Sequence, residues 1–203
     1  EAEAWLEKHP IDKFPNATTW NGAISISIDK APKEAYALFL RIPGWSQNAE
    51  VLVNNSKIND KIVSGTYLKL NQKWKKGDVI ELNLPMPVEL MEANPLVEEV
   101  KNQVAVKRGP LVYCLESDQL PSNTSVNDII LNLNSDFKTD FTELKNRKLV
   151  TIEATSKIAS DNSWNKTLYK PISTKDGKSL TVKLIPYFAW GNKGQGEMTV
   201  WMS

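Results

Sequence analysis

The chain contains several carboxylates that could support acid–base chemistry. Hydrolysis of a bond such as a glycosidic bond usually needs two carboxyl groups, one protonated as the acid and one ionised as the nucleophile or base. The first candidates are four glutamates after a proline-rich segment: Glu89, Glu92, Glu98 and Glu99. Nothing around them indicates the apolar pocket that would raise one of their pKa values, so we interpret them as solvated side chains of a linker.

A second candidate pair, Glu116 and Asp118, lies at the end of a predicted strand, where acidic residues are also common for structural reasons. Cys114 is the only cysteine and His9 the only histidine. Cys114 lies in an apolar run without the neighbouring base that a thiolate nucleophile needs, and two soft ligands are too few for a zinc site. We therefore predict no catalytic residue, no metal site and no cofactor within this chain.

Seven tryptophans could also carry function, because sugar-binding proteins stack sugars on exposed aromatic rings. Trp45 follows a Pro-Gly turn, Trp74 precedes a Lys-Lys-Gly-Asp turn, and Trp190 lies next to a predicted strand. Large rings in such places usually close the end of a β core or pack against another domain. Interdomain contact is therefore the favoured role for these three residues, and sugar contact is the alternative.

The elements that position these residues are predicted to be short strands. Ile24, Ile26 and Ile28 alternate with polar residues, a period of two that is typical of a strand with one buried face. Further strands are expected at Tyr36 to Ile42, Glu50 to Val53, Tyr67 to Leu70, Val79 to Leu84, Val104 to Lys107, Leu111 to Glu116, Asp128 to Leu133, Leu149 to Ala154, Leu180 to Pro186 and Met198 to Trp201. A helix is predicted at Ser135 to Lys145, where Phe137, Phe141 and Leu144 follow helical spacing. The fold class is therefore all-β.

Charge and hydropathy exclude two classes of partner. The 25 basic and 24 acidic residues leave a formal net charge of +1, which creates no field that would attract nucleic acid or anionic lipid. The longest apolar runs fall far short of the roughly 20 residues that span a bilayer. We therefore expect neither a nucleic-acid nor a membrane partner.

Four groups of residues occur in an order that identifies a family. They are Leu40-Arg-Ile-Pro-Gly-Trp-Ser46; Gly65-Thr-Tyr67 with Trp74-Lys-Lys-Gly-Asp78 and Leu84-Pro-Met-Pro-Val88; Val104-Ala-Val-Lys-Arg-Gly-Pro-Leu-Val-Tyr-Cys114; and Ile185-Pro-Tyr-Phe-Ala-Trp-Gly-Asn-Lys-Gly194 running into Glu197-Met-Thr-Val-Trp201. Each is weak alone, but together they are specific. Over roughly residues 20 to 203, the chain resembles the C-terminal region of glycoside hydrolase family 127, the β-L-arabinofuranosidase-type enzymes.

The resemblance implies that catalysis belongs to an upstream α-helical toroid with a zinc-bound cysteine nucleophile, further cysteine and glutamate ligands, and a glutamate acid/base. None of those positions maps onto this chain, and Cys114 matches a scaffold strand. Zinc is therefore expected in the catalytic domain that the chain lacks. The resemblance also implies two β-sandwich-like units, the second inserted into the first. We expect a terminal segment at 1–19, a first sandwich of 20–99 completed by 195–203, and a second sandwich of 100–194.

The function implied by the resemblance is that of a non-catalytic accessory scaffold. The chain would pack on the upstream catalytic (α/α) toroid of the same protein, which would hydrolyse a plant-type glycan. Two alternatives remain. A carbohydrate-binding module would present a coplanar row of exposed rings, and a purely structural interaction domain would present one broad apolar patch.

Overall fold

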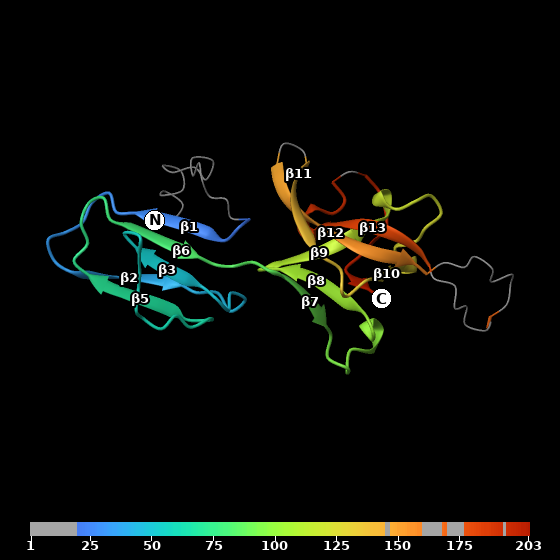
Figure 1. Ribbon diagram of the computed structural model, residues 1–203, viewed down its shortest axis with the longest axis horizontal. Coiled ribbons are helices and arrows are strands. Elements are labelled where there is room, and N and C mark those ends of the chain that lie inside the picture. Colours follow the sequence, from blue (N-terminus) through green and yellow to red (C-terminus); the bar gives the residue numbers. More distant parts are fainter. Residues whose placement is uncertain (1–19, 145–146, 160–167, 170–176, 193) are drawn as a thin grey trace. The chain divides into compact units, whose positions relative to one another are not determined.

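The computed structural model describes residues 20–144, 147–159, 168–169, 177–192 and 194–203, so the predicted terminal segment 1–19 lies outside the described residues. The chain divides into two compact units, Glu1–Met86 and Pro87–Ser203 (Figure 1). Regular structure in the described part consists of strands and one-turn 3-10 helices, which confirms the all-β class. No helix there is both long enough and apolar enough to cross a membrane.

The first unit is a β-sandwich with one core. Its strands are β1 (Ala23–Ser27), β2 (Tyr36–Arg41), β3 (Glu50–Val53), β4 (Ser56–Lys57), β5 (Tyr67–Gln72) and β6 (Val79–Asn83). One sheet has the order β1-β6-β3-β4, and β2 pairs with β5 in the other. Leu40 and Leu68 face each other across β2 and β5, and they belong to the same buried cluster as Val51 and Ile80 of the larger sheet. Burial of these aliphatic side chains between the sheets holds the unit together.

The second unit is one curled antiparallel sheet (Figure 1). Its strands are β7 (Val88–Glu92), β8 (Val104–Arg108), β9 (Leu111–Glu116), β10 (Ile129–Leu131), β11 (Lys138–Leu144), β12 (Arg147–Ile158), β13 (Lys178–Pro186), β14 (Met198–Thr199) and β15 (Trp201–Met202). The main path runs β10-β12-β13-β9-β8-β15, with β7 on β8, β11 on β12 and β14 on β9. The N–H of Leu131 donates to the carbonyl of Ser203 at 2.7 Å, so the two ends of the path meet. The sheet therefore curls around its own core and leaves few unpaired edges.

The C-terminal strands fill an opening in this sheet. The β8-β9 hairpin is paired next to its turn, where Lys107 lies opposite Val112. Farther from the turn, β14 pairs with β9 and β15 pairs with β8, with Thr199 opposite Leu115 and Trp201 opposite Ala105. The segment 198–202 thus lies between two strands that diverge from their own hairpin.

This arrangement corrects the predicted domain organisation. Residues 195–203 were expected to complete the first unit, but β14 and β15 pair with strands of the second unit. The second unit is consequently not inserted into the first, and it is one curled sheet instead of a two-sheet sandwich. The change of unit falls at Met86 and Pro87, inside the proline-rich motif Leu84-Pro-Met-Pro-Val88.

Two local predictions were also wrong. The acidic segment Glu89 to Glu99 was interpreted as a linker, but β7 occupies its first part and pairs along β8. Leu90 of β7 packs against the core of the unit, and the carboxylate of Glu89 lies 3.2 Å from Lys107 Nζ. The helix predicted at Ser135 to Lys145 is strand β11, which pairs along β12. Pairing with a distant strand outweighed the helical spacing there.

Hydrogen bonds of Asn54 and Asp78, which we name the Asn54–Asp78 clamp, connect two turns of the first unit. Asn54 and Asn55 join β3 to β4 with φ values of 51° and 62°, a conformation that Asn tolerates better than most residues. The Asn54 side chain accepts from the N–H of Val79 at 2.9 Å and donates to the carboxylate of Asp78 at 3.0 Å. Asp78 also accepts from the N–H of Lys75 at 2.7 Å. These hydrogen bonds to the ionised carboxylate lower the pKa of Asp78 below its ordinary value of 3.8.

We expect Met202→Ala to destabilise the second unit selectively. Met202 is 2% exposed and belongs to the core cluster of that unit, so truncation should cost about 2–5 kcal/mol. Hydrogen exchange would show reduced protection of β8, β9 and β13 amides and unchanged protection in β3 and β6. Leu82→Ala, at a residue 5% exposed in the first core, should give the reverse pattern. Loss of protection in β3 and β6 caused by Met202→Ala would contradict the strand pairing described here.

We expect Asp78→Ala to lower the melting temperature at neutral pH and to have little effect at pH 2. The pKa of Asp78 is depressed in the folded state, so its stabilisation is present above about 3.8 and is lost as the pH falls through the lower folded-state value. Thermal unfolding of both proteins as a function of pH measures this difference. Glu81→Ala, which removes a carboxylate from β6, serves as a control. If Asp78→Ala lowered the melting temperature by the same amount at pH 2 and pH 7, the stabilisation would not depend on ionisation of the Asp78 carboxylate.

Candidate functional site

The three tryptophans predicted to contact a partner occupy different environments. Trp74 is 1% exposed and its Nε1–H donates to the carbonyl of Tyr36 at 3.1 Å, so it is a core residue of the first unit and offers no surface. Trp45 is half-buried and packs against the same core. Trp190 is 43% exposed. The contact prediction for Trp74 is therefore wrong, because the indole buries its ring while its N–H finds a backbone acceptor.

Trp190 belongs to a group of exposed rings that we name the aromatic corner: Tyr187, Phe188 and Trp190. The group follows β13 in a one-turn 3-10 helix, Tyr187–Ala189, which is anchored by Ala189 at 3% exposure. The rings of Tyr187 and Trp190 are nearly parallel, with centroids 6.4 Å apart and an interplanar angle of 18°. The N–H of Trp190 donates to the carbonyl of Tyr187 at 3.1 Å. The turn thus fixes the spacing of its own rings.

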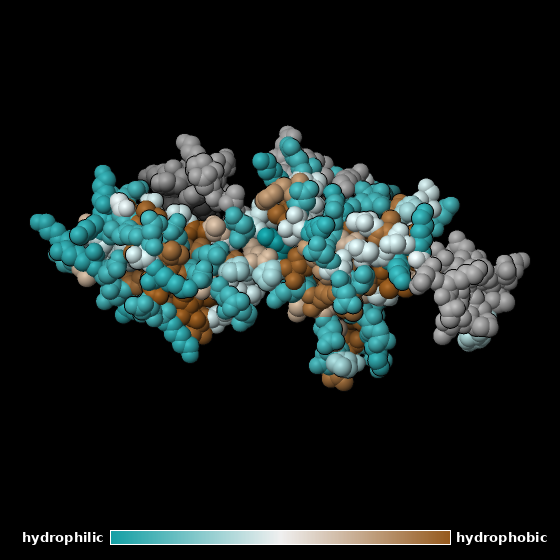
Figure 2. Space-filling model, viewed as in Figure 1, coloured by the Kyte–Doolittle hydropathy of each residue, from teal (hydrophilic) through white to brown (hydrophobic). Residues whose placement is uncertain are grey.

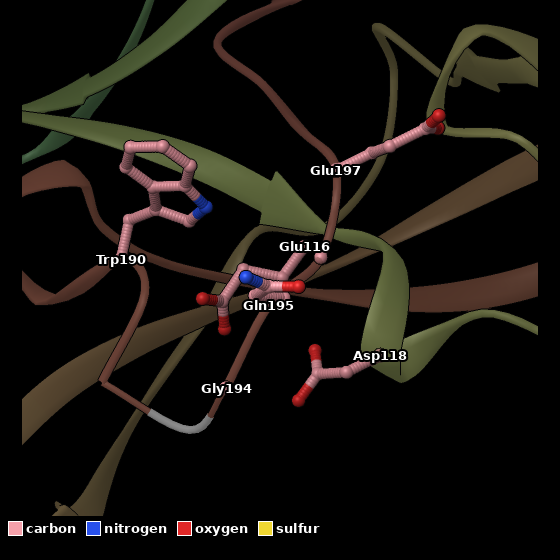
Figure 3. A pocket seen from close by; sticks show the side chains of 7 residues that line it. Glu116, Asp118, Trp190, Gly194, Gln195 and Glu197 are labelled. Atoms are coloured by element: carbon pink, nitrogen blue, oxygen red, sulfur yellow. The ribbon is translucent and has the colours of Figure 1, made fainter.

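A small cavity with both polar and apolar walls adjoins the aromatic corner. It has a volume of about 40 Å³ and is lined by Glu116, Asp118, Trp190 and residues 194–197. Figure 3 shows the side chains of Glu116 and Gln195 between Trp190 and Asp118, whereas the Glu197 side chain points away from the other carboxylates. The structure therefore brings Trp190 together with the candidate pair Glu116 and Asp118, from which it was separate in the sequence analysis.

Backbone contacts hold the cavity walls in place. The carboxylate of Glu116, a residue only 6% exposed, accepts from the N–H of Gly191 at 3.3 Å. The N–H of Ser117 donates to the carbonyl of Glu197 at 2.9 Å, and the Ser117 hydroxyl accepts from the N–H of Glu197 at 3.0 Å. Residues at the end of β9 consequently meet residues that lie 75 to 80 positions later in the chain.

Sequence reasoning missed Tyr187, Phe188, Gln195 and Glu197 as members of this site. The dense aromatic run Tyr187-Phe-Ala-Trp190 directly after a strand was the available signal for the first two. Nothing in the sequence indicated that residues 194–197 return to the end of β9. Within the described ranges, no group of three or more His, Cys, Asp and Glu side chains is arranged to hold a metal ion.

Cys114 is placed next to this site but is chemically protected. It is fully buried on β9, and burial raises the pKa of its thiol from 9.0 to about 12, with a further contribution from the negative charge of Glu116. A nucleophilic cysteine needs the opposite environment, with a nearby base, cation or metal that stabilises the thiolate. The arrangement leaves the thiol protonated at neutral pH.

Two family models match the chain, and the boundary between the matches lies at the boundary between the two structural units. Residues 13–86 match the family described as "Beta-L-arabinofuranosidase, GH127 middle domain". Residues 88–203 match the "Glycoside hydrolase family 127 C-terminal domain". The boundary between the two matches coincides with the change of unit at Met86 and Pro87.

Individual relatives cover nearly the whole chain. The non-reducing end beta-L-arabinofuranosidase of Bifidobacterium longum subsp. longum is 31% identical over 195 residues, which are 89% of this chain and 28% of that protein. The crystal structure of a GH127 beta-L-arabinofuranosidase from Geobacillus stearothermophilus T6 matches with a TM-score of 0.81 and 32% identity, over 92% of this chain and 29% of the other. A solved glycoside hydrolase matches with a TM-score of 0.84 and 42% identity, over 91% and 30%. The chain thus spans less than a third of the length of these relatives.

We expect Cys114 to react far more slowly with iodoacetamide in the native chain than in the unfolded chain. At pH 8 the thiolate fraction of a thiol with a pKa of about 12 is about a thousandfold below that of a thiol at 9.0. Mass spectrometry of the alkylated protein gives both rates. Val112→Cys in a Cys114→Ala background provides a control, because residue 112 lies on the same strand but is 41% exposed. Equal rates for Cys114 and the control cysteine would contradict the protected environment.

Proposed function

Given that the chain belongs to glycoside hydrolase family 127, we propose that it is the non-catalytic accessory part of an arabinofuranosidase-like hydrolase, and that it packs on the catalytic (α/α) toroid of that enzyme. The observation that carries this proposal is the coverage of the relatives. The chain matches the middle and C-terminal domains of the family, and the same region makes up 28% of the Bifidobacterium longum arabinofuranosidase. The remaining part of such a protein would hold the catalytic centre and its zinc.

The properties of Cys114 support a non-catalytic role for this region. The thiol is buried in the core, and burial raises its pKa to about 12. It is therefore protonated and unreactive at neutral pH. The proposed substrate of the whole enzyme is an arabinofuranosyl linkage of a plant-type glycan, by analogy with the activity named for the relatives.

Exposed apolar side chains on ordered elements support a packing role. Phe39 and Tyr67 are 60% and 65% exposed on the outward face of the β2-β5 sheet. Leu96 is 88% exposed in the segment that joins β7 to β8, where its N–H donates to the Asn94 side chain at 3.0 Å. Figure 2 shows hydrophobic residues at the tip of this protruding segment. Large apolar side chains that are held in place on a surface are typical of contact with another domain.

We expect the isolated chain to release no nitrophenol from 4-nitrophenyl β-L-arabinofuranoside in the presence of zinc and a reductant. The full-length Bifidobacterium longum arabinofuranosidase serves as the positive control. A truncated version of that enzyme, without the region that matches this chain, should form a complex with the chain in size-exclusion chromatography. A Phe39→Ser, Leu96→Ser double variant should weaken the complex, and the buried-site variant Cys114→Ala should not. Turnover by the isolated chain would contradict the non-catalytic role, and a complete lack of association would contradict packing on the toroid.

A further inference from the structure

We propose that the aromatic corner and the adjoining cavity form a binding site for one unit of a saccharide. The proposal concerns residues of the second unit alone and does not rest on the proposed packing on a toroid.

The first step of the argument is the geometry of the rings. Tyr187 and Trp190 are 48% and 43% exposed, and their planes differ by only 18°. The two rings stack, so the apolar surface open to a ligand is the exposed part of each ring and not one common plane. The C–H face of a sugar ring is complementary in shape and polarity to such an exposed indole surface.

The second step is the chemistry of the polar groups beside the rings. Gln195 carries both a donor and an acceptor, and the carboxylates of Glu116 and Asp118 are acceptors. Sugar hydroxyls act as donors and acceptors at once, so this mixture suits them. The ligand class that fits this mixture of donors and acceptors is rich in hydroxyls.

The third step is size. The cavity of about 40 Å³ has room for roughly three water molecules, since each needs about 10–15 Å³ of such volume. It cannot enclose a sugar ring, but it accepts one hydroxyl or hydroxymethyl group. The ring itself would lie over Trp190 with that group directed toward Glu116, which fits a single terminal sugar better than the middle of a polymer.

The fourth step is preorganisation. Trp190 is fixed by the turn that begins at Tyr187, and the Asn192 side-chain amide donates to the carbonyl of Ala189 at 2.9 Å. The N–H of Gly191 holds the Glu116 carboxylate at 3.3 Å. Groups already held in position lose little conformational freedom when a ligand binds, which favours affinity.

In the described part of the first unit, the exposed Tyr67 ring has a different neighbour and provides a control surface. The guanidinium of Arg41 lies 5.4 Å from the centre of the Tyr67 ring and occupies one of its faces. The Arg41 side chain is in turn bonded to the carbonyl of Thr66 at 3.1 Å. Exposure of an aromatic ring alone therefore does not distinguish the proposed site. The stacked pair beside a cavity that also carries polar groups does.

The test is isothermal titration and saturation-transfer NMR of the whole chain with methyl β-L-arabinofuranoside and with arabino-oligosaccharides. We expect saturable binding that weakens at least tenfold with Trp190→Ala and severalfold with Gln195→Ala, while Trp190→Phe keeps most of it. Phe39→Ala should leave it unchanged, and circular dichroism would confirm that every variant is folded.

Three outcomes would overturn the proposal. These are the absence of binding by the folded parent chain up to about 10 mM sugar, binding that survives Trp190→Ala but is lost in Phe39→Ala, and preferential binding of methylammonium over the sugars. A negative result here combined with complex formation in the previous experiment would remove the sugar site and leave the accessory role intact.

Discussion

The structure of the second unit depends on the insertion of its C-terminal strands between β8 and β9. A two-residue turn at Gly109 and Pro110 starts this hairpin, with Gly109 at a φ of 56°, as the first position of such a turn requires. The hairpin would expose its inner edges where the strands diverge, and β14 and β15 supply the missing partners there. One short segment thereby satisfies backbone groups of two strands and reaches the edge of β10.

The same insertion creates the candidate site. Met198 lies opposite Glu116 in the β14-β9 pair, which brings residues 194–197 beside the end of β9. Gly191, which follows the aromatic corner, bonds the carboxylate of Glu116 from another direction. The cavity therefore results from the way the sheet closes, and it brings together residues from Glu116 to Glu197.

Local signals in the sequence predicted most strands but not how they pair. The bounds of β3 and β9 match the prediction residue for residue, because apolar alternation and flanking turn residues mark both ends. β11 was mistaken for a helix because Phe137, Phe141 and Leu144 have helical spacing. In the structure Phe141 is 57% exposed on a strand that β12 pairs with along its length. The final strands carry no local mark of their partners, so the resemblance alone guided that prediction, and it was wrong.

The site could be predicted only in parts for the same reason. Glu116 and Asp118 stood out at a strand end, and Trp190 stood out as an aromatic beside a strand, but their juxtaposition depends on long-range pairing. The structure adds an electrostatic link between the site and the core. The carboxylate of Glu116 helps to raise the pKa of Cys114, so the thiol stays uncharged beside a buried acid. An environment that disfavours a thiolate cannot activate it for attack, yet the fixed carboxylate remains a hydrogen-bond acceptor at the cavity. The end of β9 thus presents a hydrogen-bond acceptor and a thiol that is not activated as a nucleophile.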